Sequence, residues 1–187
     1  MPTWTSQLPQ FVRVATQAAR QAGAILVARI GDPTTVETKR SPVDLVTDID
    51  RASQALIHRT LQAAFPDHGF HGEEAALLRA DAPYRWIVDP IDGTTNFVHG
   101  LPLFGISIGL AYRDTLLAGV IYDPMRRELF VAMNGRGAFL NGKRLSVSKT
   151  PRVALSLLST GFASTFREHS RRYLRWFEVF ELSSHGV

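Results

Sequence analysis

The chain has 187 residues, which is enough for one full domain or for one domain and part of another. Its composition, 45% hydrophobic and 20% charged, is typical of a soluble globular protein, and the absence of cysteine excludes disulfides and thiolate metal sites. The formal net charge of +4 and the pI near 9.8 fit a nucleic-acid partner or an anionic substrate, and charge alone does not separate the two.

Neither a membrane span nor a signal peptide is predicted. The longest early apolar stretch, residues 22–28, is too short to cross a bilayer. Residues 1–20 lack the basic start and the apolar core of a signal peptide. We therefore expect no membrane partner and a cytoplasmic location, which the lack of cysteine also fits because that compartment is reducing.

The N-terminal part of the sequence predicts two amphipathic helices. In the first, apolar residues recur at helical spacing from Leu8 to Ile30, and Gly31 is a suitable end. The second begins after Thr47, which suits an N-cap, and Asp50 three residues on resembles the acidic partner of a capping box. Its predicted apolar residues are Ile49, Ala52, Leu56, Leu61 and Phe65.

After Pro66 the sequence predicts strands. Short runs rich in β-forming residues at 103–113, 116–124, 128–133 and 137–140 are joined by turn residues, and this order predicts an antiparallel meander. Asn134-Gly135 and Asn141-Gly142 are the hairpin signals. A last helix is predicted near the C-terminus, with a buried stripe formed by Phe166, Tyr173, Leu174, Phe177 and Phe180.

The segment WIVDPIDGTTNFVHG, residues 86–100, carries the strongest chemical signal. Residues 86–88 predict the end of a buried strand, which Pro90 is expected to stop because it lacks an N–H group. Gly93 permits a sharp or left-handed turn, and residues 94–96 suit the start of a helix. The predicted order is strand, carboxylates, glycine turn and helix.

This order has two chemical uses. Asp89 and Asp92 offer hard oxygen ligands to a cation such as Mg²⁺. The free N–H groups at Gly93, Thr94 and Thr95 favour an anion such as phosphate at the helix start. Taken on these residues alone, a turn shaped by the two aspartates explains the pattern equally well.

Two further segments contain candidate functional groups. HGEEA, residues 71–75, places Glu73 and Glu74 after a predicted strand end, although a glutamate pair by itself is usually exposed surface. GAFLNGKR, residues 137–144, nearly matches a phosphate-binding P-loop, but Arg144 stands where a hydroxyl is required. A hairpin turn explains that segment, so the P-loop is rejected.

Together, SPVDLVTDID, HGEEA and WIVDPIDGTTNFVHG resemble the inositol monophosphatase family in order and spacing. The resemblance implies a mixed α+β and α/β fold, a layered sugar-phosphatase sandwich of helices and sheets. Residues 1–150 would form two helices and an antiparallel sheet that carry the metal site. Residues 151–187 would begin a second αβ subdomain that is incomplete.

The resemblance also implies a Mg²⁺-dependent, lithium-sensitive phosphatase with two or three metal ions. Such an enzyme would use a metal-activated water to release phosphate from inositol monophosphate or a similar small polyol phosphate, and family members are commonly homodimers. Its implied metal ligands are Glu73, Asp89, the Ile91 carbonyl and Asp92. Its implied catalytic residues are Thr94, Asp50 and Glu73, and its implied substrate-binding residues are Ile91, Asp92, Gly93 and Thr94. Lys39 lies where the family often has a lysine near the site.

The chain departs from the family near its C-terminus. Family members continue further, and a later Trp-Asp pair supplies another aspartate to the second metal, whereas here no aspartate occurs beyond Asp123. We interpret the chain as C-terminally truncated and expect weak binding of the second metal. The alternative function is a catalytically weak or inactive family member that binds a partner, such as a nucleic acid, through the basic helix at residues 167–175.

Overall fold

The structure is a computed structural model that describes residues 3–33, 35–38, 45–74, 77–162 and 166–187. This described chain divides into two compact units, Met1–Leu145 and Ser146–Val187. The assignment of residues 1–150 to a metal-binding part and of 151–187 to an incomplete subdomain stays a prediction. No helix within the described ranges is long and apolar enough to cross a membrane.

The first unit contains a large sheet, a small sheet and three α-helices among its described residues. The α-helices are α1 (Leu8–Arg29), α2 (Asp48–Ala64) and α3 (Thr94–Val98), and a short 3₁₀ helix, η1 (Thr3–Ser6), precedes them. The strands are β1 (Val36–Thr38), β2 (Leu45–Thr47), β3 (Gly69–Gly72), β4 (Tyr84–Asp92), β5 (Gly105–Tyr112), β6 (Thr115–Asp123), β7 (Glu128–Met133), β8 (Gly137–Leu140) and β9 (Lys143–Arg144).

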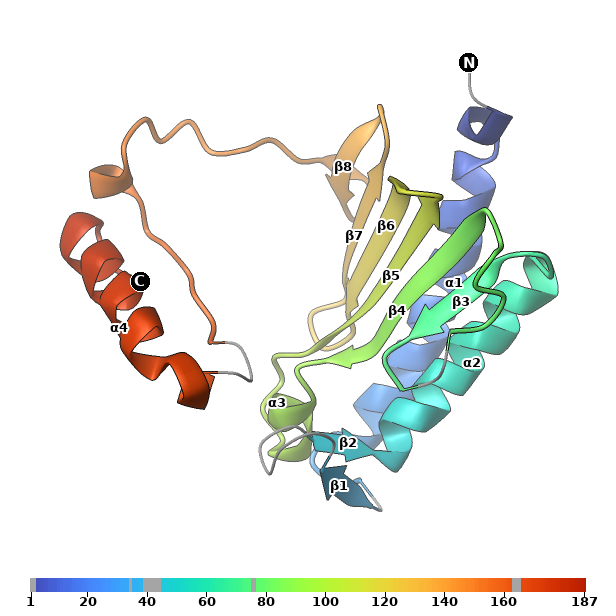
Figure 1. Cartoon of the computed structure of the whole chain (residues 1–187), viewed down its shortest axis with the longest axis horizontal. Helices are drawn as coiled ribbons and strands as arrows, with labels where there is room; N and C mark the ends of the chain where they lie inside the picture. Colours follow the sequence, from blue (N-terminus) through green and yellow to red (C-terminus); the bar gives the residue numbers. More distant parts are fainter. Residues whose placement is uncertain (1–2, 34, 39–44, 75–76, 163–165) are drawn as a thin grey trace. The chain divides into compact units, whose positions relative to one another are not determined.

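The large sheet has the strand order β3-β4-β5-β6-β7-β8-β9 (Figure 1). Every pairing from β4–β5 to β8–β9 is antiparallel, which confirms the predicted meander. The hairpin at Asn141-Gly142 has positive φ at both residues, as the sequence signal requires. The parallel pairing of β3 with β4 was not predicted from the sequence.

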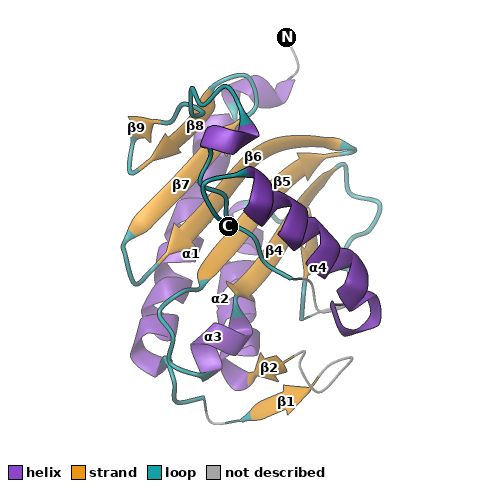
Figure 2. Cartoon of the chain, turned by 90° about the vertical axis from the view of Figure 1, so that its left-hand side faces the viewer, coloured by secondary structure: helices purple, strands orange, loops and turns teal. Residues whose placement is uncertain are grey.

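Helices α1 and α2 pack on each other and cover one face of the large sheet (Figures 1 and 2). Alternation along β5 shows why: Ile106, Ile108 and Leu110 are buried and point toward the helices, while the residues between them are only partly buried. This layered arrangement confirms the predicted mixed fold of helices and sheets. It also places the N-terminus of α2 beside the strand ends that carry the candidate site.

The two predicted N-terminal helices are confirmed, with one correction to the buried face of α2. Ala52 was predicted on that face but is exposed, and Leu56 is only partly buried. Ser53 and Gln54 are buried instead, together with Ile57. The helix turns this polar face toward backbone groups that need hydrogen bonds, and the apolar pattern alone could not indicate such a need.

Strand β4 also differs from the prediction. Pro90 was expected to stop the strand, but β4 continues to Asp92 across a register shift between Asp89 and Asp92. A bulge tolerates proline because its residues stand outside the ladder and need no donor there. The prediction of an all-buried strand end is wrong too, since Ile87 is 40% exposed between buried Trp86 and Val88.

The second unit contains η2 (Val153–Leu155) and α4 (Phe166–Ser183) among its described residues. The predicted buried stripe of α4 is wrong, because no residue of this helix is buried. Phe162, Tyr173, Phe177 and Phe180 line a hollow of about 300 Å³ instead. The helix and the adjoining extended segment are too small a unit to cover an aromatic face by themselves.

A cluster of aromatic rings packs in the core of the first unit. The His68 ring stacks between Phe65 and Tyr84, with centroid distances of 4.9 Å and 4.7 Å and an interplanar angle of 13° in both cases. Burial among these rings lowers the pKa of His68 to about 4, an effect that nearby Asp67 opposes. The folded chain therefore holds a neutral imidazole at pH values above about 4.

This cluster predicts a loss of stability on mild acidification. The unfolded chain takes up a proton on His68 near pH 6.5, whereas the folded chain does so near pH 4, so His68 weakens the fold as the pH falls from 7 to 5. After allowance for solvent screening, the loss is about 1 kcal/mol. Thermal unfolding of the His68→Phe variant should show a smaller loss over this range than wild type. The same substitution at exposed His99 is the control for the change of side chain itself, and equal pH profiles for His68→Phe and wild type would contradict the prediction.

Candidate active site

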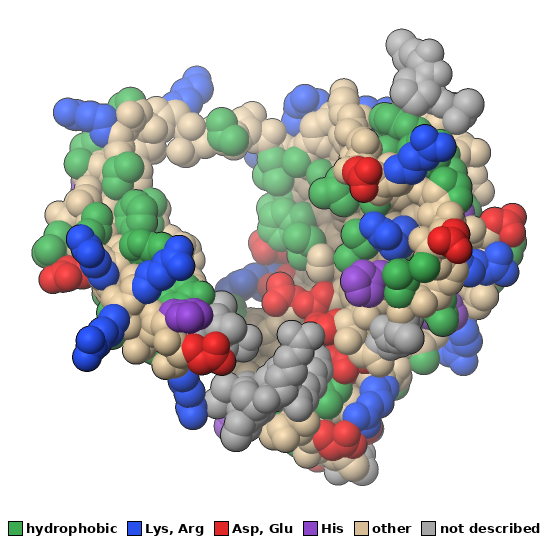
Figure 3. All heavy atoms as spheres, in the orientation of Figure 1, with side chains coloured by type: hydrophobic (Ala, Val, Ile, Leu, Met, Phe, Trp, Pro, Cys, Tyr) green, Lys and Arg blue, Asp and Glu red, His purple; other side chains and the backbone are tan. Residues whose placement is uncertain are grey.

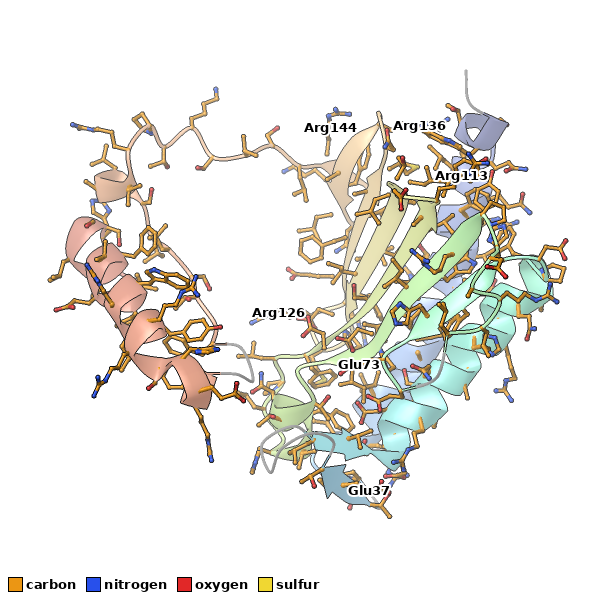
Figure 4. The ribbon with its side chains drawn as sticks, in the orientation of Figure 1. Glu37, Glu73, Arg113, Arg126, Arg136 and Arg144 are labelled. Carbon is orange, nitrogen blue, oxygen red and sulfur yellow. The ribbon has the colours of Figure 1, made fainter. Side chains whose placement is uncertain are left out.

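The parallel pairing of β3 with β4 brings two distant carboxyl groups together. Gly72 pairs with Val88, so Glu73 and Asp89 follow directly after facing residues, and the Glu73 N–H donates to the Val88 carbonyl at 3.1 Å. Figure 4 labels Glu73 beside the end of β4. The Glu73 side chain lies close enough to Asp89 to act on its carboxyl group through charge and hydrogen bonding, and acidic side chains gather on this part of the viewed surface in Figure 3.

The carboxyl pair is electrostatically unfavourable without a cation. Burial, the charge and hydrogen bond of Glu73, and the charge of Asp92 raise the pKa of Asp89 to about 7. The Ile91 N–H, which donates to Asp89 Oδ1 at 3.1 Å, opposes this rise. Two carboxyl groups that share a hydrogen bond must hold a proton between them or be neutralised by a positive ion.

The register shift in β4 frees the backbone between the two aspartates. Asp89 still pairs with Ser107 and Asp92 with Gly105, but Pro90 and Ile91 stand outside the ladder. The Ile91 carbonyl accepts a hydrogen bond from Thr94 Oγ1 at 3.0 Å. The bulge therefore directs the Ile91 carbonyl toward the start of α3, while Asp92 beyond it is exposed to solvent.

Gly93 makes the corner between β4 and α3. Its φ of +97° lies in the region that favours glycine, and a Cβ there would lie 3.0 Å from the Leu103 carbonyl oxygen. The chain then enters α3 at Thr94, where the first N–H groups of a helix have no intrahelical acceptor. Gly93 and Thr94, the implied phosphate-binding pair, thus occupy the partly buried start of this short helix.

Asp50 joins the start of α2 to the start of α3. Its side chain is buried, and Oδ2 accepts from the Thr47 N–H at 2.8 Å and from Thr47 Oγ1 at 2.5 Å. The capping box with Thr47 is complete, as the sequence predicted. Asp50 Oδ1 lies 3.2 Å from Thr94 Oγ1, so a carboxylate that caps one helix also contacts the hydroxyl of the next.

The donor set is suited to a hard divalent cation, although it is not gathered as a complete coordination shell. Over the described ranges, no group of three or more histidine, aspartate and glutamate side chains is arranged to hold a metal ion. Glu73 and Asp89 form the close pair, and Asp92 acts on Asp89 through its charge. Carboxylate and carbonyl oxygens are the ligands that Mg²⁺ takes in proteins, so these residues fit such an ion.

Two residues at this site were missed from the sequence, and one predicted residue cannot be placed. Ser53 and Gln54 are buried and hydrogen-bond to the segments that carry the acidic residues. Their spacing of three and four from Asp50 was the available signal, since such residues share a helix face. Lys39 lies outside the described residues.

Comparison with known proteins gives the family. The model of the inositol monophosphatase family matches residues 7–185. This chain belongs to the inositol monophosphatase family. It is 44% identical to inositol monophosphatase 1 of Solanum lycopersicum over 162 residues, which cover 84% of this chain and 59% of that protein. The chain thus spans less than two thirds of that relative's length.

Solved structures agree with the family. The extragenic suppressor protein suhB of Bartonella henselae superposes with a TM-score of 0.87 and 37% identity, covering 95% of this chain and 68% of that one. An inositol monophosphatase and NADP phosphatase complexed with NADP and Ca²⁺ gives a TM-score of 0.70 and 29% identity, covering 79% of this chain and 56% of that one. The family fold therefore extends over nearly all of this chain.

The carboxyl pair predicts an unusual stabilising substitution, Asp89→Asn. Because the pKa of Asp89 is raised in the folded chain, its contribution to stability is complete below pH 3.8 and is lost as the pH rises through about 7. In chelator at pH 8, Asp89→Asn should therefore stabilise the chain by about 1 kcal/mol after allowance for screening. Thermal unfolding in EDTA and in Mg²⁺ measures this, with Asp81→Asn as the exposed control. A lower melting temperature for Asp89→Asn in EDTA would contradict it.

Proposed function

We propose that this chain carries the catalytic site of a Mg²⁺-dependent phosphatase that acts on inositol monophosphate or a similar small polyol phosphate. The observation that carries the proposal is the hydrogen bond of Thr94 to Asp50, together with the parallel pairing that brings Glu73 and Asp89 to neighbouring strand ends. Family membership supports a phosphatase. The proposal extends to a homodimer and to a cytoplasmic location.

The metal ligands in this proposal are Glu73, Asp89, Asp92 and the carbonyl of Ile91. When bound, Mg²⁺ supplies positive charge to the phosphate and makes a water molecule more acidic. The raised pKa of Asp89 supports this assignment, because a nearby cation would favour the charged form of a partly buried carboxyl group that lies beside another acidic side chain. A related structure with Ca²⁺ supports the use of a divalent ion by the family.

In this proposal, Thr94 orients the attacking water and Asp50 receives its proton. Thr94 Oγ1 has one proton and two acceptors for it, the Ile91 carbonyl at 3.0 Å and Asp50 Oδ1 at 3.2 Å. If the carbonyl binds the cation, the proton would go to Asp50, and the lone pairs of Thr94 could accept a hydrogen bond from water. The water oxygen forms a bond to phosphorus as the ester P–O bond breaks. The water proton moves through Thr94 toward Asp50, and the departing inositol oxygen takes a proton from solvent. Asp50 holds this position because the capping box fixes it at the start of α2.

The phosphate would lie at the start of α3. The N–H groups of Gly93 and Thr94 open this helix, and the first N–H groups of a helix favour an anion. Thr94 thus has both its backbone donor and its side-chain hydroxyl at the reacting phosphate. The Gly93 corner supports this arrangement, since the left-handed backbone there lets the chain turn directly from Asp92 into the helix.

The hydroxyl of Thr94 gives the sharpest test of the proposed chemistry. Thr94→Ala should lower kcat for inositol 1-phosphate in Mg²⁺ by about 10²–10³-fold, because the group that positions the water is lost. Thr94→Ser should retain most of the activity. Thr95→Ala, the exposed neighbouring threonine, is the matched control and should behave as wild type. Phosphate release is measured with and without Mg²⁺, and Mg²⁺-independent turnover would refute the proposed function.

The second candidate function is binding of a nucleic acid through α4. Its support is a basic stretch at residues 167–175 and the packing of the Arg172 guanidinium over the Trp176 ring at 4.4 Å, with Trp176 45% exposed. Arginine and exposed aromatic rings are the usual contacts to single-stranded nucleic acid. Affinity for single-stranded RNA that falls with salt, ignores Mg²⁺ and decreases on Arg172→Ala would favour this candidate.

A further inference from the structure

One face of α2 carries three buried polar side chains, and each contacts a different part of the candidate site. Asp50, Ser53 and Gln54 are exposed by only 1%, 0% and 6%. Their spacing of three and four residues puts them on one face of the helix. Buried polar groups are costly unless they are hydrogen-bonded, so a helix face of this kind indicates specific contacts. Asp50 belongs to the proposed chemistry, and the other two residues have no role in it.

Ser53 holds the bulge of β4. Its Oγ donates to the Pro90 carbonyl at 3.1 Å. Pro90 lies between Asp89 and Asp92, where the ladder to β5 is interrupted and its carbonyl has no place in the regular pairing. A buried carbonyl without a donor would destabilise this conformation of the bulge. Ser53 therefore ties α2 to the backbone directly after Asp89.

Gln54 holds the end of β3. Its Oε1 accepts from the Glu74 N–H at 2.9 Å, in a partly buried position. The amide packs so closely on Gly72 that a Cβ at that position would collide with it. The glycine thus admits the glutamine, and the glutamine satisfies the backbone just past the end of the strand. Glu73 lies between these two contact points.

We propose that Ser53 and Gln54 are positioning residues that hold the Glu73 and Asp89 carboxyl groups at the separation that binds the cation. They are neighbours on one rigid helix, so the ends of β3 and β4 cannot shift relative to each other without breaking one of the two hydrogen bonds. This inference rests on the proposed function, because it assigns the held carboxyl groups to Mg²⁺. The role differs from simple packing, which an apolar side chain of equal size would fulfil.

The test compares Gln54→Met, which keeps the size but removes the acceptor, with Gln54→Glu, which keeps an acceptor oxygen. Gln62→Met makes the first substitution at an exposed position of the same helix and is the matched control. Amide hydrogen exchange of Glu74 is measured by NMR, and Mg²⁺ affinity by calorimetry. We expect Gln54→Met to speed exchange of the Glu74 amide at least tenfold and to weaken Mg²⁺ binding about 10-fold, as loss of a group that orients a metal ligand does. Gln54→Glu should keep the amide protected.

The remaining outcomes separate this inference from the function on which it rests. In a phosphatase assay, Gln54→Met should require more Mg²⁺ for half-maximal rate and regain most of its kcat at saturating Mg²⁺. If wild type binds Mg²⁺ and Gln54→Met binds it equally well, the positioning role is wrong while the proposed function stands. If wild type binds no Mg²⁺ and releases no phosphate, the proposed function fails, and the assignment to metal binding fails with it.

Ser53→Ala provides a second variant in case Gln54→Met does not fold. It removes one hydrogen bond and only a small volume, so the chain should remain folded. A loss of Mg²⁺ affinity of about threefold is expected, because the hydrogen bond to the bulge is lost while the hydrogen bond between Gln54 and the Glu74 N–H remains. Unchanged affinity for Ser53→Ala would count against a role of this residue in holding Asp89.

Discussion

The site depends on the parallel alignment of β3 and β4 at one edge of the large sheet. Every other neighbouring pair of strands in the described large sheet is antiparallel. The C-terminal end of an antiparallel partner would lie beside the N-terminal end of β4 and not beside its C-terminal end. Only parallel strands let Glu73 and Asp89 leave the sheet side by side. The close approach of like charges that results has an electrostatic cost, visible in the raised pKa of Asp89, which a divalent cation would offset.

The surroundings are built to keep this unfavourable arrangement in place. The bulge in β4 turns backbone groups out of the sheet, Gly93 allows the corner, and the buried polar face of α2 satisfies the groups that the bulge exposes. An irregular backbone conformation is stable only where contacts from several neighbouring elements hold it in place. Here one helix contributes the cap carboxylate, the serine and the glutamine, so the same element sets the position of three segments.

Two partly buried titratable groups of the first unit, His68 and Asp89, respond to pH in opposite directions. His68 is stacked among aromatic rings and favours a fold at neutral pH, because protonation would place a charge among apolar side chains. Asp89 sits beside other carboxyl groups and favours a fold at lower pH when no cation is bound. The His68 effect arises in the core and the Asp89 effect arises at the site. The close acidic side chains of the site therefore lower the stability of the metal-free chain at neutral pH.

The sequence by itself determined the helices, the meander, the capping box of Thr47 and Asp50, and the identity of the acidic segments, because helical periodicity, turn residues and caps are local properties of the chain. It could not determine that β3 pairs parallel with β4, that β4 passes Pro90 through a bulge, or that Ser53 and Gln54 replace Ala52 on the buried face of α2. Those features arise from hydrogen bonds between residues about 20 to 40 positions apart, and which groups need such partners is decided only when the helix packs on the strand ends.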